Sequence, residues 1–180
     1  AVWTALGHIY GFTNTNRRSV PFSTASKLAT LSTLGLLLQM AYGAFNAGLK
    51  AGHVSDTWPL MLGRWMPQDL LNQIQPPALN LVAAPLTVAF IHRWLAFILL
   101  VFVGVALYVI GRLSLESGLR KVLRWIAALS ALQIGLGIAV VVSRVSIAVA
   151  LLHQANALAL FVLAVYSLHR LRNRDAIAAA

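Results

Sequence analysis

Residues 86–111 read LTVAFIHRWLAFILLVFVGVALYVIG, and Arg93 is the one formally charged side chain in this run. An α-helix needs about 20 mostly apolar residues to cross the hydrocarbon core of a bilayer. The run therefore predicts a transmembrane helix. Three further runs of the same kind occupy residues 26–47, 122–142 and 145–168. We therefore expect an all-α membrane protein, folded as a four-transmembrane-helix bundle.

The composition excludes a water-soluble globular domain. Hydrophobic residues make up 59% of the 180 residues and charged residues only 10%, whereas soluble domains have about 45–50% and about 25%. The net charge of +10 would indicate nucleic-acid binding in a soluble chain, but here the basic residues lie between apolar runs. The expected partner is the lipid bilayer, with no nucleic acid. Because the chain has no cysteine, histidine is the main candidate metal ligand.

The apolar runs divide the chain into three parts. Residues 1–25 are interpreted as the stub of a preceding helix and a cytoplasmic linker, which makes the chain a fragment of something longer. Residues 26–170 are expected to form the bundle, with an outer loop over residues 48–85, and residues 171–180 a cytoplasmic tail. Within the loop, residues 58–66 are rich in Trp, Leu and Met. They predict a short amphipathic piece on the bilayer surface, a lid over an outer site, or a solvated loop anchored by its aromatic side chains.

The lysines and arginines near the helix ends indicate the orientation, because cytoplasmic loops carry an excess of them. Ten lie on the side of both chain ends: Arg17, Arg18, Lys27, Arg112, Arg120, Lys121, Arg124, Arg170, Arg172 and Arg174. The opposite side has only Lys50, Arg64 and Arg144. Both termini are therefore expected on the cytoplasmic side of a bacterial cytoplasmic membrane, or on the matrix side of the mitochondrial inner membrane.

A weak duplication relates the first two helices to the last two. In the first and third helices a glutamine is followed four residues later by glycine, and in the second and fourth a histidine is followed four residues later by alanine. The repeated residues are Gln39 with Gly43, Gln133 with Gly137, His92 with Ala96, and His153 with Ala157. Repeats in membrane proteins commonly place a shared site at their interface.

The two repeated histidines predict a haem site. His92 and His153 lie near the outer ends of helices that run in the same direction, so their imidazoles share one depth. Two neutral imidazoles approaching from opposite sides satisfy both axial positions of haem iron. Ala96 and Ala157 lie on the same helix faces, where a small side chain lets a flat macrocycle come close. Zinc would need three or four ligands.

The other repeated residues leave alternatives open. Gln39 and Gln133 are expected either to hydrogen-bond the far ring nitrogen of an axial histidine or to bond another helix. Gly43 and Gly137, together with Gly35, are interpreted as helix-packing residues.

Two arginines are candidates for holding the haem propionates. Arg93 directly follows one proposed ligand, and Arg144 lies at the outer turn that leads to the other. Arginine suits paired contacts with carboxylates; the alternative is that Arg93 snorkels to the interface and Arg144 is a solvated turn residue. His8, His53 and His169 are expected to be interfacial and not ligands.

The runs YGAFNAGLKAGHVSDTWPLMLGRWMP, FIHRWLA and LLHQANALALF resemble the C-terminal half of the haem A synthase family. The resemblance covers residues 26–170. It implies one half of an eight-helix, pseudo-twofold protein that oxidises the C8 methyl of haem O to the formyl group of haem A for cytochrome oxidase assembly. His92 and His153 match the histidine pair that holds a b-type haem in that half of the family.

The resemblance also implies what this chain lacks. The family binds its substrate, haem O, in the other half, with a glutamate three residues before the first histidine; here that position is Ala89, so no catalytic residue is expected. The implied partners are haem O synthase, an electron donor and, as a possibility, a second copy of the protein. The alternatives are a stand-alone b-type membrane cytochrome with two histidine ligands, acting as an electron carrier, and half of a transporter.

Overall fold

The computed structural model describes residues 22–113 and 115–179, and in this part of the chain it is helical without strands. The four long helices are α2 (Phe22–Gly48), α4 (Pro85–Gly111), α5 (Ser117–Val142) and α6 (Ile147–Ala179). Each is long and apolar enough to cross a membrane. The predicted all-α, four-span membrane fold is thereby confirmed. The predicted stub, residues 1–25, lies almost wholly outside the described residues, as does His8.

The long helices extend past the apolar runs that predicted them. α2 and α5 begin four and five residues earlier than expected, and α6 continues to Ala179 through residues that we interpreted as a tail. α6 begins at Ile147 and not at residue 145 because Arg144 and Val145 adopt left-handed backbone conformations. Hydropathy marks the part of a helix inside the membrane, whereas backbone hydrogen bonds decide where the helix ends.

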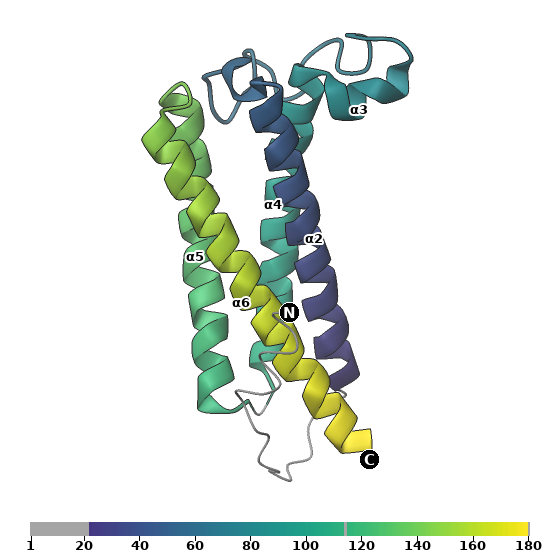
Figure 1. Ribbon diagram of the computed structural model, residues 1–180, viewed down its shortest axis with the longest axis vertical. Coiled ribbons are helices and arrows are strands. Elements are labelled where there is room, and N and C mark those ends of the chain that lie inside the picture. The colour runs from purple at the N-terminus through teal and green to yellow at the C-terminus, as the bar shows by residue number, and fades with distance from the viewer. Residues whose placement is uncertain (1–21, 114, 180) are drawn as a thin grey trace.

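The helices pack as two pairs. α2 lies along α4, α5 lies along α6, and α2 also contacts α6 extensively, whereas α4 and α5 touch less. Gly35 permits the first of these pairings, because a Cβ at this position would lie 2.7 Å from Cδ1 of Leu99. Figure 1 shows the loop between α2 and α4 and the α5–α6 turn at one end of the bundle, and the end of α6 at the other. We call these the outer and inner ends.

The apolar core lies in the inner half of the bundle. It is built from the first turns of α2 and α5 and the later turns of α4 and α6, with Leu99, Val103, Ile110, Leu119, Leu123, Leu160 and Leu171 among its buried members. No residue within a turn of His92 or His153 belongs to this core cluster. The histidines therefore lie between this core and a second, smaller apolar cluster under the outer loop, formed by Ala51, Met61 and Ala89.

The outer loop carries three short helices, η1 (Ala51–His53), η2 (Pro77–Leu79) and α3 (Asn80–Ala83). Asn80 is fully buried and organises the segment before α3: its Oδ1 accepts from the backbone N–H groups of Gln73 and Ile74, and its Nδ2 donates to three carbonyls. One side chain thus satisfies five buried backbone groups that the loop has no ladder or helix to pair. The loop has a defined shape over the outer end.

Within residues 58–66, which we predicted to be a short amphipathic piece, residues 61–64 form a tight turn. The backbone groups of Met61 and Arg64 bond each other across Leu62 and Gly63, both with positive φ, which is the geometry of a type I′ turn. Met61 is buried, whereas Trp58, Leu62, Trp65 and Met66 are exposed. The apolar side chains therefore point outward without helical order, and their placement on the bilayer surface stays a prediction.

Candidate functional site

The first glutamine–histidine pair joins α2 to α4. Nε2 of Gln39 donates to the backbone carbonyl of His92 at 3.0 Å and lies 3.2 Å from its ring Nδ1. The same imidazole rests on the bare backbone of Gly43, where a Cβ would lie 3.3 Å from Cε1 of His92. The contact of Gln39 with Nδ1 leaves Nε2 of the ring for another ligand.

The second pair repeats this arrangement between α5 and α6. Nε2 of Gln133 lies 3.3 Å from Nε2 of His153, and a Cβ at Gly137 would lie 3.2 Å from Cε1 of that ring. The far ring nitrogen, Nδ1, is buried and has no hydrogen-bond partner. A buried polar atom without a partner costs free energy unless something else binds it. The predicted unit of a glutamine helix and a histidine helix is therefore present twice.

These contacts realise both alternatives for the glutamines, a histidine ring nitrogen and a further bond to another helix, and they correct our interpretation of two glycines. Both glutamines contact an imidazole. Gly43 and Gly137 are not merely helix-packing residues, since each provides the space that a histidine ring occupies. Gly35, by contrast, does serve helix packing. A glycine four residues after the glutamine lies one turn further along the same helix face. The same helix therefore provides both the glutamine that contacts the imidazole and the glycine against which the imidazole packs.

Asn156 is a site residue that the sequence analysis missed. Its Nδ2 donates to Oε1 of Gln133 at 2.6 Å and to the carbonyl of Leu129 at 3.0 Å, and the side chain is buried. The Leu129 carbonyl can only accept, so it fixes which end of the Asn156 amide faces Gln133. A polar residue one turn after His153 on an apolar helix was the available signal. The equivalent position in the first repeat is Leu95.

The two imidazoles come from the second helix of each repeat, His92 from α4 and His153 from α6. The surrounding layer consists of the eight repeat residues, all of which are half-buried: Gln39, Gly43, His92, Ala96, Gln133, Gly137, His153 and Ala157. In the inner half, inward-facing residues are buried against each other. The layer formed by the eight repeat residues therefore has accessible surface that the described part of the chain does not cover.

The donor set fits a planar cofactor held by two axial imidazoles. Each histidine has one ring nitrogen against a glutamine and the other without a protein partner, and small residues lie one turn further on each histidine helix. Within residues 22–113 and 115–179, no group of three or more His, Asp or Glu side chains lies together. The described residues thus present two imidazoles on two helices and no cluster of three or four protein ligands.

Arg93 anchors the outer loop. Its guanidinium donates to the carbonyls of Ser55 and Thr57, at 2.8 and 3.0 Å. The side chain therefore does not simply snorkel to the interface. It ties the helix that carries His92 to the loop above it.

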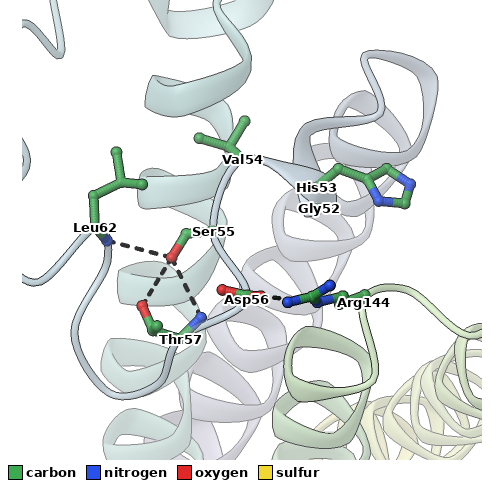
Figure 2. A pocket seen from close by; sticks show the side chains of 8 residues that line it. All are labelled: Gly52, His53, Val54, Ser55, Asp56, Thr57, Leu62 and Arg144. Carbon is green, nitrogen blue, oxygen red and sulfur yellow. Dashed lines mark hydrogen bonds and ion pairs between the residues drawn. The ribbon is translucent and has the colours of Figure 1, made fainter.

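Arg144 reaches the same loop from the other side. Its Nε donates to Oδ2 of Asp56 at 2.9 Å, as Figure 2 shows. Both this residue (φ 53°) and Val145 (φ 63°) are left-handed, a conformation that costs non-glycine residues about 1–2 kcal/mol each. A pair this exposed adds little stability by itself. The unfavourable backbone conformation of Arg144 and its contact with the outer loop together indicate that this residue serves to position the guanidinium and the loop, and not to gain stability from the ion pair.

A cavity of about 330 Å³ opens between the loop and the α5–α6 turn. It is lined by residues 52–57, Leu62 and Arg144 (Figure 2). In the figure the Ser55 hydroxyl contacts Thr57 and the backbone N–H of Leu62, which closes the loop around one wall. His53 lines this cavity, and its side chain is exposed.

His169 departs from our expectation. We expected an interfacial side chain, but it is 2% exposed and lies inside the inner end of the bundle, with Nε2 3.0 Å from Nδ2 of Asn173. The next residue, Arg170, pairs with Glu116 just before α5. These contacts close the inner end of the bundle, away from the two imidazoles.

Comparisons with protein-family models and with curated proteins point to the same family. The family model described as "Cytochrome oxidase assembly protein" matches residues 1–165. A protein named heme A synthase from Rhodospirillum centenum is 40% identical over 144 residues, which cover 80% of this chain and 38% of that protein. Its namesake from Parvibaculum lavamentivorans is 34% identical over 171 residues, covering 94% of this chain and 46% of that protein. The chain thus spans less than half of these relatives. No solved structure matches it.

Proposed function

Because this chain belongs to the family of cytochrome oxidase assembly proteins, we propose that it is the cofactor-binding half of a haem A synthase. The proposal is supported by relatives of that name and by the chain's coverage of less than half of their length. The whole protein would oxidise the C8 methyl of haem O to the formyl group of haem A. Its substrate would bind in the other half, because this half has Ala89 where the family's substrate site has a glutamate.

In this proposal His92 and His153 would hold the iron of one b-type haem. When bound, that haem supplies a one-electron redox centre. Gln39 and Gln133 orient the two rings, Gly43 and Gly137 seat them, and Ala96 and Ala157 leave room beside them. An electron donor and a haem O synthase that supplies the substrate complete the set of partners.

Arg93 and Arg144 are proposed to face the two haem propionates. Each guanidinium has five N–H donors, and the contacts to the loop use two of them in Arg93 and one in Arg144. A propionate would therefore share each arginine with the loop. This sharing would fasten residues 55–57 over the outer edge of the cofactor.

One observation carries the proposal: in both repeats a glutamine and a glycine of one helix contact a histidine ring of the next helix. The glutamine lies against Nδ1 of His92 in the first repeat and against Nε2 of His153 in the second, and the other ring nitrogen has no hydrogen bond to the described residues of the protein. The test is to express the chain in bacterial membranes, purify it, and measure haem content and the electron paramagnetic resonance spectrum. We expect one b-type haem per chain with a low-spin spectrum of two histidine ligands. A chain that acquires no haem, or only five-coordinate high-spin haem, would refute the assignment.

The same preparation distinguishes the enzyme from a stand-alone cytochrome. Co-expression with the N-terminal half of a relative such as that of Rhodospirillum centenum, in a host that lacks its own haem A synthase, should restore haem A if this chain is the cofactor half. A stand-alone electron carrier would bind haem equally well but leave the host without haem A. The readout is the haem A content of the membranes.

We predict that both ends of the chain lie on the cytoplasmic or matrix side, with residues 48–85 on the other side. The support is the ten-to-three distribution of basic residues and the positive-inside rule. Compartment-specific reporters fused at Asp69 and after Ala180 should report opposite compartments. Equal signals from the two fusions would contradict the orientation.

We predict that Asn156→Leu destabilises the bundle by about 1–2 kcal/mol, because it leaves Oε1 of Gln133 without its donor in an apolar interior. The control is Asn46→Leu, since the buried Oδ1 of Asn46 has no hydrogen-bond partner to lose. Thermal unfolding of the haem-loaded chains in detergent would be compared. Equal losses of thermal stability in the two variants would show that the hydrogen bond from Asn156 to Gln133 makes no specific contribution.

A further inference from the structure

A groove of about 360 Å³ lies on α5, far from the two imidazoles, and is lined by Lys121, Arg124, Trp125 and Ala128. The four residues are spaced i, i+3, i+4 and i+7, so they share one face of the helix. All four are exposed, Trp125 to 54%. The face begins one turn from the start of α5, at the inner end of the bundle (Figure 1).

No ion pair within the described residues neutralises the two cations of the groove. Among the described residues, the ion pairs join Arg144 to Asp56 and Arg170 to Glu116. Lys121 and Arg124 take part in neither. Two positive charges therefore stand one turn apart, with an aromatic ring between them and the apolar part of the helix.

The apolar surface continues from the groove towards the middle of the membrane. Leu132 and Gly135 follow Ala128 at further positions of the same face. Leu132 is half exposed, and a Cβ at Gly135 would meet nothing within 4 Å. Ala128 and Gly135 thus leave a smooth, open strip that leads away from the charges.

We propose that this face binds one anionic phospholipid. Lys121 and Arg124 hold its phosphate, the Trp125 ring lies at the level of the headgroup, and an acyl chain follows the strip past Ala128 to Gly135. Basic residues at the membrane surface attract anionic lipids, and tryptophan favours the interface between headgroups and hydrocarbon. A zwitterionic lipid would bring its own positive group to the same two cations, so the face selects for net negative charge.

The test compares Lys121→Gln/Arg124→Gln with the control Lys27→Gln/Arg112→Gln. Both double variants remove two exposed positive charges from the inner end of the bundle, but only the first alters the groove. The chain is placed in nanodiscs of phosphatidylcholine with increasing phosphatidylglycerol, and lipid retained by the protein is counted by native mass spectrometry. The groove variant should bind phosphatidylglycerol about 30-fold more weakly than the unchanged chain, and the control nearly as well as the unchanged chain.

Three outcomes would overturn the proposal. One is an equal loss in the two double variants, which would show a general charge effect. Another is displacement of the lipid by inorganic phosphate alone, which would show that the site needs no acyl chain. The third is a change of oligomeric state in the groove variant without a change in bound lipid, which would assign the face to a second copy. Thermal unfolding of the variants in detergent serves as the folding control, so this test stands apart from the proposed function.

Discussion

Replacement of either His92 or His153 by alanine should abolish the low-spin haem of the purified chain. Each substitution removes one of the two imidazoles that the proposal assigns to iron, and nothing else within the described residues offers a third. The remaining histidine would hold at most a five-coordinate, high-spin haem. Haem content per chain and the electron paramagnetic resonance spectrum measure both effects.

Two controls separate the loss of a ligand from misfolding. His53→Ala changes a histidine of the outer loop that belongs to neither pair, and it should leave the spectrum unchanged. Added imidazole should restore a low-spin spectrum in the two ligand variants, because truncation to alanine opens space for it. Full haem content with an unaltered spectrum in either His92→Ala or His153→Ala would exclude that residue as a ligand.

The second large effect is expected from filling the space behind the rings. In Gly43→Val and Gly137→Val the new Cβ would lie 3.3 and 3.2 Å from Cε1 of the histidine, and the two methyl groups would reach further into the ring. Overpacking of this kind costs about 1–3 kcal/mol, which corresponds to roughly a five- to 150-fold loss of haem affinity. Haem retention during titration with a competing apo-haemoprotein would measure the loss.

The chain offers a matched control for this prediction. Gly135 lies on the same helix as Gly137, but a Cβ there would meet nothing within 4 Å. Gly135→Val therefore makes the same chemical change on the same helix without touching a ring, and its haem affinity should stay within twofold of the unchanged chain. If Gly135→Val and Gly137→Val lost haem equally, the glycines would act through the helix backbone and not through the imidazoles.

The outer loop illustrates what separates this site from a generic pair of histidines in a bundle. Arg93 lies in α4 and Arg144 in the turn between α5 and α6, yet both bind loop residues between Ser55 and Thr57. The loop is thereby fastened to the helix of His92 and to the turn that leads into the helix of His153. Because these contacts are direct hydrogen bonds, a change in the distance between α4 and the α5–α6 turn would move the loop. A movement of the loop would in turn pull on α4 and on that turn.

Several features followed from the sequence by itself. The number of membrane spans depends on local composition, since each run of about 20 apolar residues forms its own helix in a bilayer. The repeat also placed His92 and His153 at one depth, because position along a helix converts directly into height. It could not say whether Gln39 and Gln133 would reach a ring.

Other features were decided only by the tertiary structure. Which residues meet between helices depends on the rotation of each helix about its axis and on side-chain packing, and neither is encoded in local hydropathy. Hence the seating of two imidazoles on Gly43 and Gly137, the bond of Asn156 to Gln133, and the burial of His169 all became visible only when the helices were packed. The partners of Arg93 and Arg144 lie in a loop whose path is set by buried polar contacts such as those of Asn80, and such contacts join residues that no pattern in the sequence relates.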